Sequence, residues 1–181
     1  MAIGKPKFYW DTAPLIAWIT DEKRDDPAEM AGLSEVLELV DRGKAILMTS
    51  VLWRAEVFDS SLTAAQKKKL DAVFDGSSII ELGIDSRVMT LTSEIRAFQS
   101  QSKKKDAIKY LSVPDAIHLA SAIHWGASEF HTFDGAKKAG RNRGALLTMD
   151  GNVGGHRLKV CIPKGDQFLL EWGSPDADAA E

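Results

Sequence analysis

The stretch "KFYWDTAPLIAW", residues 7–18, decides the fold because it joins a buried strand directly to a helix. Residues 7–10 form a short, mostly apolar run that is typical of a buried β-strand. Pro14 suits the first turn of a helix, where its missing N–H is not needed, and we expect this helix to end near Thr20. Asp11 therefore lies between the two elements, either as a solvated loop acid or as a metal ligand at the mouth of a sheet.

The rest of the chain alternates in the same way between short apolar runs and segments of helical spacing. Further strands are predicted over residues 45–50, 77–84, 128–134 and 157–163, and further helices over 33–43, 51–62, 63–74, 86–101 and 111–127. Thr63 and Gln66 form a capping-box pair, and Asp85 can cap the helix that follows it. Strands that alternate with helices predict an α/β fold, with a mainly parallel central sheet and helices on both faces.

The length of 181 residues suits one domain, which we expect to cover residues 1–172. Two segments, at about 21–32 and 135–155, are polar or rich in glycine and are expected to be additional surface loops. Residues 173–181 form an acidic tail that is expected to be frayed.

The composition limits the class of protein without identifying a partner. Cys161 is the single cysteine, so no disulfide can form within the chain, and a reducing compartment such as the cytoplasm is expected. The sequence has no visible secretory signal and no apolar run approaching the roughly 18 residues that span a bilayer, so no membrane partner is expected. The net charge of −3 leaves any affinity for nucleic acid to local basic patches.

Four acidic residues fall where a parallel sheet usually binds its ligands, outside the carboxyl ends of the strands. Asp11 and Asp134 end predicted strands, Glu56 lies two turns into the helix predicted after residues 45–50, and Asp115 lies in the first turn of another helix. If these carboxylates converge, two of them about 4 Å apart repel by roughly 4 kcal/mol at an effective dielectric constant near 20. A divalent cation would relieve this repulsion.

The ligand types favour particular metals and a particular reaction. Carboxylate oxygens suit Mg²⁺ or Mn²⁺ better than zinc. Such ions can activate water against a phosphodiester and stabilise the attacking and leaving oxygens.

Each acid also has an ordinary structural interpretation. Asp115 is a good residue for a helix N-terminus, and Asp134 precedes Gly135 and is a good turn residue. Glu56 is more informative, because it shares a predicted helical stripe with Leu52 and Ala55 and is expected to point toward the core. A glutamate in that position needs a partner.

At these residues the sequence resembles the PIN-domain nuclease family. The similarity lies in four segments that occur in the family's order between residues 7 and 134: "FYWDTAPLIAW", "MTSVLWRAEVF", "VPDAIHLASAIHWGA" and "EFHTFD". The resemblance implies a compact three-layer α/β/α PIN-like fold with a central, mainly parallel sheet. It also implies a ribonuclease that uses Mg²⁺ or Mn²⁺ to hydrolyse RNA phosphodiester bonds by metal-activated water.

The resemblance assigns roles to individual residues of this chain. It implies that Asp11, Glu56, Asp115 and Asp134 are the catalytic metal ligands. It also places Thr132 in the catalytic set, at the polar position just before the last acid, where it would orient a ligand or water.

Many small members of the family are VapC-like toxins, so the resemblance implies a small antitoxin protein as a partner, RNA as the substrate and a homodimer. A non-catalytic PIN-like module that binds RNA or protein and a housekeeping RNA-processing nuclease are the alternatives. The non-catalytic alternative is motivated by Ala13, where the family often has Asn or Ser, and by "GAKKAG" after Asp134, where a further acid is usual. A haloacid-type phosphatase is disfavoured, because it needs a second acid at position 13.

The basic residues after Asp134 have two interpretations. Lys137, Lys138, Arg141 and Arg143 follow Asp134 and are either a solvated charge cluster or contacts for RNA phosphates.

His118 lies one turn after Asp115 and is expected to pack and hydrogen-bond as a core histidine, with a substrate contact as the alternative. His124 and His131 have no acidic neighbour at metal-ligand spacing and are assigned no role.

Overall fold

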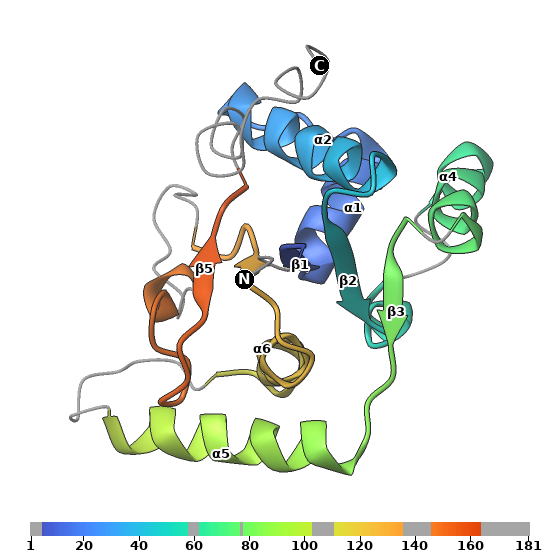
Figure 1. The fold of residues 1–181 in the computed structure, drawn as a ribbon. Coiled ribbons are helices and arrows are strands. Elements are labelled where there is room, and N and C mark those ends of the chain that lie inside the picture. Colours follow the sequence, from blue (N-terminus) through green and yellow to red (C-terminus); the bar gives the residue numbers. More distant parts are fainter. Residues whose placement is uncertain (1–4, 58–61, 77, 103–110, 136–145, 164–181) are drawn as a thin grey trace, which may run out of the picture.

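The computed structural model describes residues 5–57, 62–76, 78–102, 111–135 and 146–163. Within these residues a five-stranded sheet runs in the order β3-β2-β1-β4-β5, and every neighbouring pair is parallel (Figure 1). The strands are β1 (Lys7–Trp10), β2 (Ile46–Ser50), β3 (Ile80–Leu82), β4 (Glu129–His131) and β5 (Lys159–Cys161). The sheet confirms the predicted α/β class, and each of the five strands overlaps a predicted strand.

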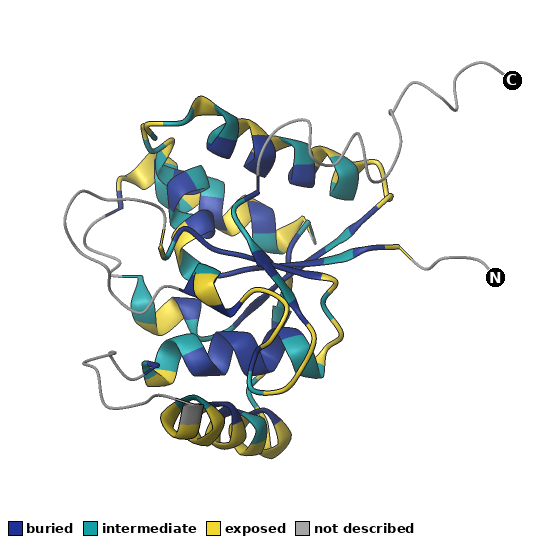
Figure 2. Ribbon diagram, turned by 90° about the vertical axis from the view of Figure 1, so that its left-hand side faces the viewer, coloured by how far each residue is buried: buried dark blue, intermediate teal, exposed yellow. Residues whose placement is uncertain are grey.

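Helices cover both faces of the sheet, as predicted (Figures 1 and 2). One layer contains α1 (Thr12–Thr20), α2 (Pro27–Asp41) and α4 (Ala64–Asp75), and the other contains α5 (Ser86–Ser102) and α6 (Val113–His124). Two shorter elements complete the order: α3 (Trp53–Glu56) and the 3₁₀ helix η2 (Leu146–Met149). None of the described helices combines the length and the apolar character that a bilayer crossing requires.

The central strand β1 separates two hydrophobic cores. Phe8 and Trp10 belong to the core beneath α1 and α2, whereas Tyr9 belongs to the core beneath α5 and α6. All three side chains are completely buried, as the dark strands in the middle of Figure 2 illustrate. Strands covered on both faces are usually apolar throughout, and this explains the uninterrupted apolar run that ends at Trp10.

The register of β1 determines which loops meet at the carboxyl edge of the sheet. Tyr9 pairs with Met48 of β2 and with Phe130 of β4, so the ends of these three strands lie at the same level. The backbone N–H of Asp11 donates to the carbonyl of His131 at 3.1 Å and extends the pairing beyond β1. The segments that follow β1, β2 and β4 therefore start side by side.

The surface loop predicted over residues 21–32 is wrong for its second half, because α2 begins at Pro27. Asp26 caps this helix by accepting a hydrogen bond from the backbone of Ala28 at 3.0 Å, and Pro27 occupies the first turn. Most of the charged residues that suggested a loop do lie before α2, at positions 21–26, and Glu29 lies in its first turn. Glu29 is buried and forms an ion pair with Arg24 at 2.7 Å.

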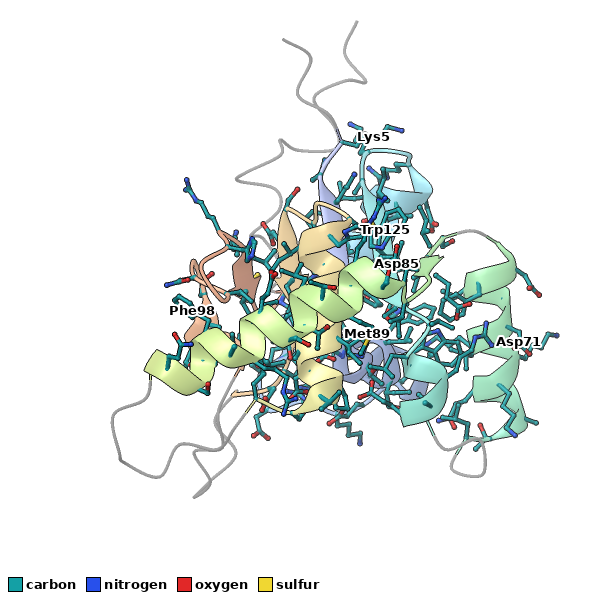
Figure 3. All side chains as sticks on the ribbon, turned by 90° about the horizontal axis from the view of Figure 1, so that it is seen from below. Lys5, Asp71, Asp85, Met89, Phe98 and Trp125 are labelled. Atoms are coloured by element: carbon teal, nitrogen blue, oxygen red, sulfur yellow. The ribbon has the colours of Figure 1, made fainter. Side chains whose placement is uncertain are left out.

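The predicted caps of α4 and α5 are confirmed. Thr63 and Gln66 form the predicted capping box at the start of α4. Asp85, labelled in Figure 3 at the start of α5, accepts hydrogen bonds from the backbone of Arg87 and Val88. Of the loop expected over 135–155, residues 136–145 lie outside the described residues, and 146–155 form η2 and tight turns. The tail over 173–181 also lies outside them.

Two glycines in these turns allow a matched test of packing. Gly151 and Gly154 both have positive φ, but a Cβ on Gly154 would lie 2.9 Å from Cα and Cγ1 of the buried Ile95, whereas Gly151 has open space around it. We expect Gly151→Ala to lower the free energy of unfolding by about 1–2 kcal/mol, from the left-handed conformation alone. We expect Gly154→Ala to lower it by about 1–3 kcal/mol more, from the added overpacking. Urea unfolding of both variants measures the difference, and equal losses would contradict the packing of this turn against α5.

Candidate active site at the carboxyl edge of the sheet

Asp11 is buried at the junction of β1 and α1, and its carboxylate is held from two sides. As the N-cap of α1 it accepts a hydrogen bond from the backbone of Thr12 at 2.7 Å through Oδ1. Its Oδ2 accepts the hydroxyl proton of Thr132 at 2.9 Å. The same hydroxyl oxygen accepts the backbone N–H of Asp134 at 3.0 Å, so the buried Thr132 connects the two predicted ligands.

The surroundings of Asp11 disfavour its negative charge. Burial raises its pKa, and the nearby charge of Asp115 raises it further, whereas His118, Thr132 and the Thr12 N–H act in the opposite direction. A desolvated carboxylate with a second carboxylate nearby fits a site for a divalent cation, because the cation would favour both negative charges.

Glu56 reaches the site in a different way from the one predicted. It is the last residue of the single-turn helix α3, not two turns into a longer helix, because the chain becomes extended at Val57. The predicted apolar stripe is therefore wrong, and Ala55 is exposed. The turn of α3 is anchored by Trp53, which is buried and donates from its indole N–H to Glu81 at 2.8 Å.

Glu56 does have the partners that its partial burial requires. Its Oε2 accepts a hydrogen bond from the hydroxyl of Thr12 and a second from Nε2 of His118, which lies 2.9 Å away. Burial acts to raise the pKa of Glu56, but the hydrogen bonds from His118 and Thr12 outweigh it and hold the pKa below its ordinary value. Glu56 is therefore held as a carboxylate.

His118 is the residue of the candidate site that the sequence interpretation underestimated. It is completely buried and hydrogen-bonded, as expected of a core histidine, but its partners belong to the site. Nδ1 lies 2.8 Å from the Tyr9 hydroxyl, and Nε2 lies 3.9 Å from Oδ1 of Asp11. The spacing of three residues from Asp115 on α6 was the available sequence signal, but it cannot show that Glu56 lies opposite.

The other two predicted ligands lie at the ends of neighbouring segments. Asp115 is in the first turn of α6, which Ser112 caps, and it is half-buried. Within the described part of the chain its carboxylate has no hydrogen-bond partner. Asp134 is also half-buried, and its carbonyl accepts the backbone N–H of Leu147 at 3.3 Å.

The structure links the predicted acids, but not as one close cluster. Thr12 and His118 join Asp11 to Glu56, and Thr132 joins Asp11 to the backbone of Asp134. Among the described residues, the four predicted acids do not form a group whose ligand atoms all lie within 4.8 Å of one another. The predicted phosphate contacts lie outside the described residues: Lys137, Lys138, Arg141 and Arg143.

A group that does meet this distance lies beside the site, on β4 and β5, and consists of Glu129, His131 and Cys161. The prediction that His131 has no acidic neighbour at metal-ligand spacing is therefore wrong, because Glu129 lies two residues earlier on the same face of β4. Nε2 of His131 lies 3.0 Å from Oε2 of Glu129, and the ammonium of Lys159 lies 2.9 Å from Oε1.

The members of this second group, on β4 and β5, already form hydrogen bonds with one another. The indole N–H of Trp10 donates to Nδ1 of His131 at 3.2 Å, so the proton of a neutral imidazole is on Nε2, where it is donated to Glu129. A metal ion could bind Nε2 only by displacing that proton, because Nδ1 already accepts the hydrogen bond from Trp10. The group is thus a hydrogen-bonded network as it stands.

This network gives the protein a predicted acid sensitivity. Burial alone would raise the pKa of Glu129, but His131 and Lys159 bring it down from 4.5 to about 2. The stabilisation is therefore complete above about pH 4.5 and is lost as the pH falls toward about 2. Burial also lowers the pKa of His131, so acid favours the unfolded chain there as well.

We expect Glu129→Gln to lower the free energy of unfolding by about 1–3 kcal/mol at neutral pH and by less at about pH 3. The matched control is Glu38→Gln, which breaks only the exposed pair with Arg42 and should change stability by less than about 0.5 kcal/mol. Urea unfolding across this pH range measures both. A difference between wild type and Glu129→Gln that stays constant with pH would refute the coupling.

Comparison with known proteins supports the fold. No model of a known protein family matches the sequence, and no curated protein is measurably similar to it. Among solved structures, the chain is similar to the crystal structure of VapBC2 from Rickettsia felis bound to a DNA fragment from their promoter. The match has a TM-score of 0.51 and 14% sequence identity, and it covers 70% of this chain and 86% of that chain. The PIN-like α/β/α fold expected from the four sequence segments is therefore confirmed.

Proposed function

We propose that this protein is a ribonuclease that uses Mg²⁺ or Mn²⁺ to hydrolyse RNA phosphodiester bonds. The observation that carries the proposal is the buried Asp11 at the end of β1, with Glu56 held as a carboxylate beside it and Asp115 lacking a hydrogen-bond partner among the described residues. These hard oxygen donors at the carboxyl edge of a parallel sheet suit Mg²⁺ or Mn²⁺. The similarity in fold to VapBC2 supports the same assignment.

Asp11, Glu56, Asp115 and Asp134 would hold the cation. When bound, it would lower the pKa of a water molecule and offset the charge that develops on the phosphodiester. The protein's own part is to hold the ligands: Thr132 orients Asp11, and Thr12 donates a hydrogen bond to Glu56. Thr132 already donates its hydroxyl proton to Asp11, so it would influence the cation through that carboxylate.

A toxin of a toxin–antitoxin pair is the biological role that we propose for this nuclease. The similar structure is a VapBC2 complex bound to promoter DNA, and this supports a small antitoxin protein as the partner here. RNA as substrate, a homodimer and a cytoplasmic location belong to the same proposal.

Two observations favour a second candidate, a non-catalytic PIN-like module that binds RNA or protein. The four acids do not form a close group of ligand atoms among the described residues, and position 13 is alanine, exposed beside Asp11. Metal binding distinguishes the candidates, because a module without a working site would show no Mn²⁺ binding that depends on these acids.

For the nuclease, we expect Asp11→Asn and Asp115→Asn to lower the rate of RNA cleavage in Mn²⁺ by more than about 100-fold. Outer-shell partners of a metal already change affinity or activity by about 10–100-fold, so loss of a ligand should have at least that effect. The control is Asp71→Asn on the exposed face of α4 (Figure 3), which should cleave at the wild-type rate. Cleavage of a labelled single-stranded RNA measures all three, and undiminished cutting by both site variants would show that the site is wrong.

For the toxin role, we expect induction of the chain without a partner to arrest the growth of a bacterial host, because RNA cleavage would halt protein synthesis. Asp11→Asn at equal expression should leave growth unchanged. Growth curves after induction give the result. Normal growth with an enzyme that is active in vitro would favour the RNA-processing alternative instead.

A further inference from the structure

Two completely buried residues, Tyr9 and His118, connect the Glu56 carboxylate to the core through hydrogen bonds. Tyr9 belongs to the central strand, where its ring stacks on Phe130 at a centroid distance of 5.3 Å. Its hydroxyl lies 2.8 Å from Nδ1 of His118, and Nε2 of the same imidazole lies 2.9 Å from Oε2 of Glu56. A continuous line of hydrogen bonds therefore runs from the core to the site.

The direction of these hydrogen bonds follows from the donors. A carboxylate only accepts, so Nε2 of His118 must carry a proton and donate it to Glu56. Nδ1 is then the natural acceptor for the Tyr9 hydroxyl. Thr12 donates to the same Oε2, so the two hydrogen bonds to Glu56 use one oxygen. Within the described part of the chain, Oε1 has no hydrogen-bond partner.

The backbone around Glu56 gives it little support of its own. The helix α3 has only one turn, and Arg54 and Ala55 are both exposed. The buried residue of this turn is Trp53. Its ring stacks on Phe74, and its indole N–H donates a hydrogen bond to Glu81. The placement of the Glu56 carboxylate next to Asp11 therefore depends on side-chain hydrogen bonds more than on the helix.

We propose that His118, held by Tyr9, is a positioning residue that fixes Glu56 through Oε2 and leaves Oε1 available for the cation. This inference rests on the proposed function, because it assumes that Glu56 contributes to a Mg²⁺ or Mn²⁺ site. His118 itself binds neither cation nor RNA in this role. Its nearest acid is Glu56, at 2.9 Å from Nε2, whereas Oδ1 of Asp11 lies 3.9 Å away, so its effect on the cation should be transmitted mainly through Glu56.

The test is a double-mutant cycle read out by Mn²⁺ affinity, with wild type, His118→Leu, Glu56→Gln and the double variant. We expect His118→Leu to weaken Mn²⁺ binding by about 10–100-fold, the range for partners that orient metal ligands. In the Glu56→Gln background the same change should have almost no further effect. His118→Gln, which keeps an N–H donor near the Nε2 position, should recover most of the affinity.

A matched control lies on the same helix. His124→Leu removes a half-buried histidine at the end of α6, where its ring contacts Trp125, and should leave Mn²⁺ affinity unchanged. A merely structural effect of His118→Leu would persist in the Glu56→Gln background, and this outcome overturns the proposal. If wild type binds Mn²⁺ through Asp11 but His118→Leu binds equally well, this inference fails alone. If Asp11→Asn does not affect Mn²⁺ binding, the proposed function fails with it.

A second measurement needs no metal and leaves His118 and Tyr9 unchanged. Nitrogen-15 NMR of the metal-free protein should find Nε2 of His118 protonated and its resonance shifted by Glu56→Gln. An unprotonated Nε2 would remove the hydrogen bond to Glu56 and overturn the proposal, whatever the protein does with Mn²⁺.

Discussion

The burial of β1 on both faces is the constraint on which the rest of the structure depends. Phe8 and Trp10 point into one core and Tyr9 into the other, and none of the three is exposed to solvent. A strand in this position cannot shift its register by one residue without exchanging the side chains of the two cores. The end of the strand is therefore fixed, and with it the place where Asp11 leaves the sheet.

The polar groups at that end are linked by a small number of buried hydrogen bonds. Thr132 binds Asp11 from the side of β4, while His118 and Thr12 bind Glu56 from α6 and α1. Buried polar groups are stable only when they are paired, so these contacts stabilise the fold and also orient the acids. The same side chains thus serve both the core and the proposed site.

A second polar network lies next to the first and shares its dependence on β1. Trp10 sets the proton position of His131, which in turn donates to Glu129, and Lys159 supplies the opposite charge. The network ties β1, β4 and β5 together on the face that packs under α1 and α2. Its position explains how a nearly buried glutamate can keep its charge in this half of the sheet.

The sequence by itself determined the α/β class, the five strands, most of the helices and the capping of α4 and α5, because these features depend on local patterns of apolar residues and caps. It also placed Asp11 at a strand end and His118 in the core. Local patterns failed at the start of α2, where the Asp26–Pro27 cap was missed among charged residues, and at α3, which stops after one turn.

Only the tertiary structure decided which side chains meet. The partners Glu56 and His118 are 62 residues apart in the sequence, and Tyr9 and His118 are 109 apart. No local signal encodes such pairs, because they follow from the parallel register that brings the ends of β1, β2 and β4 to one edge of the sheet.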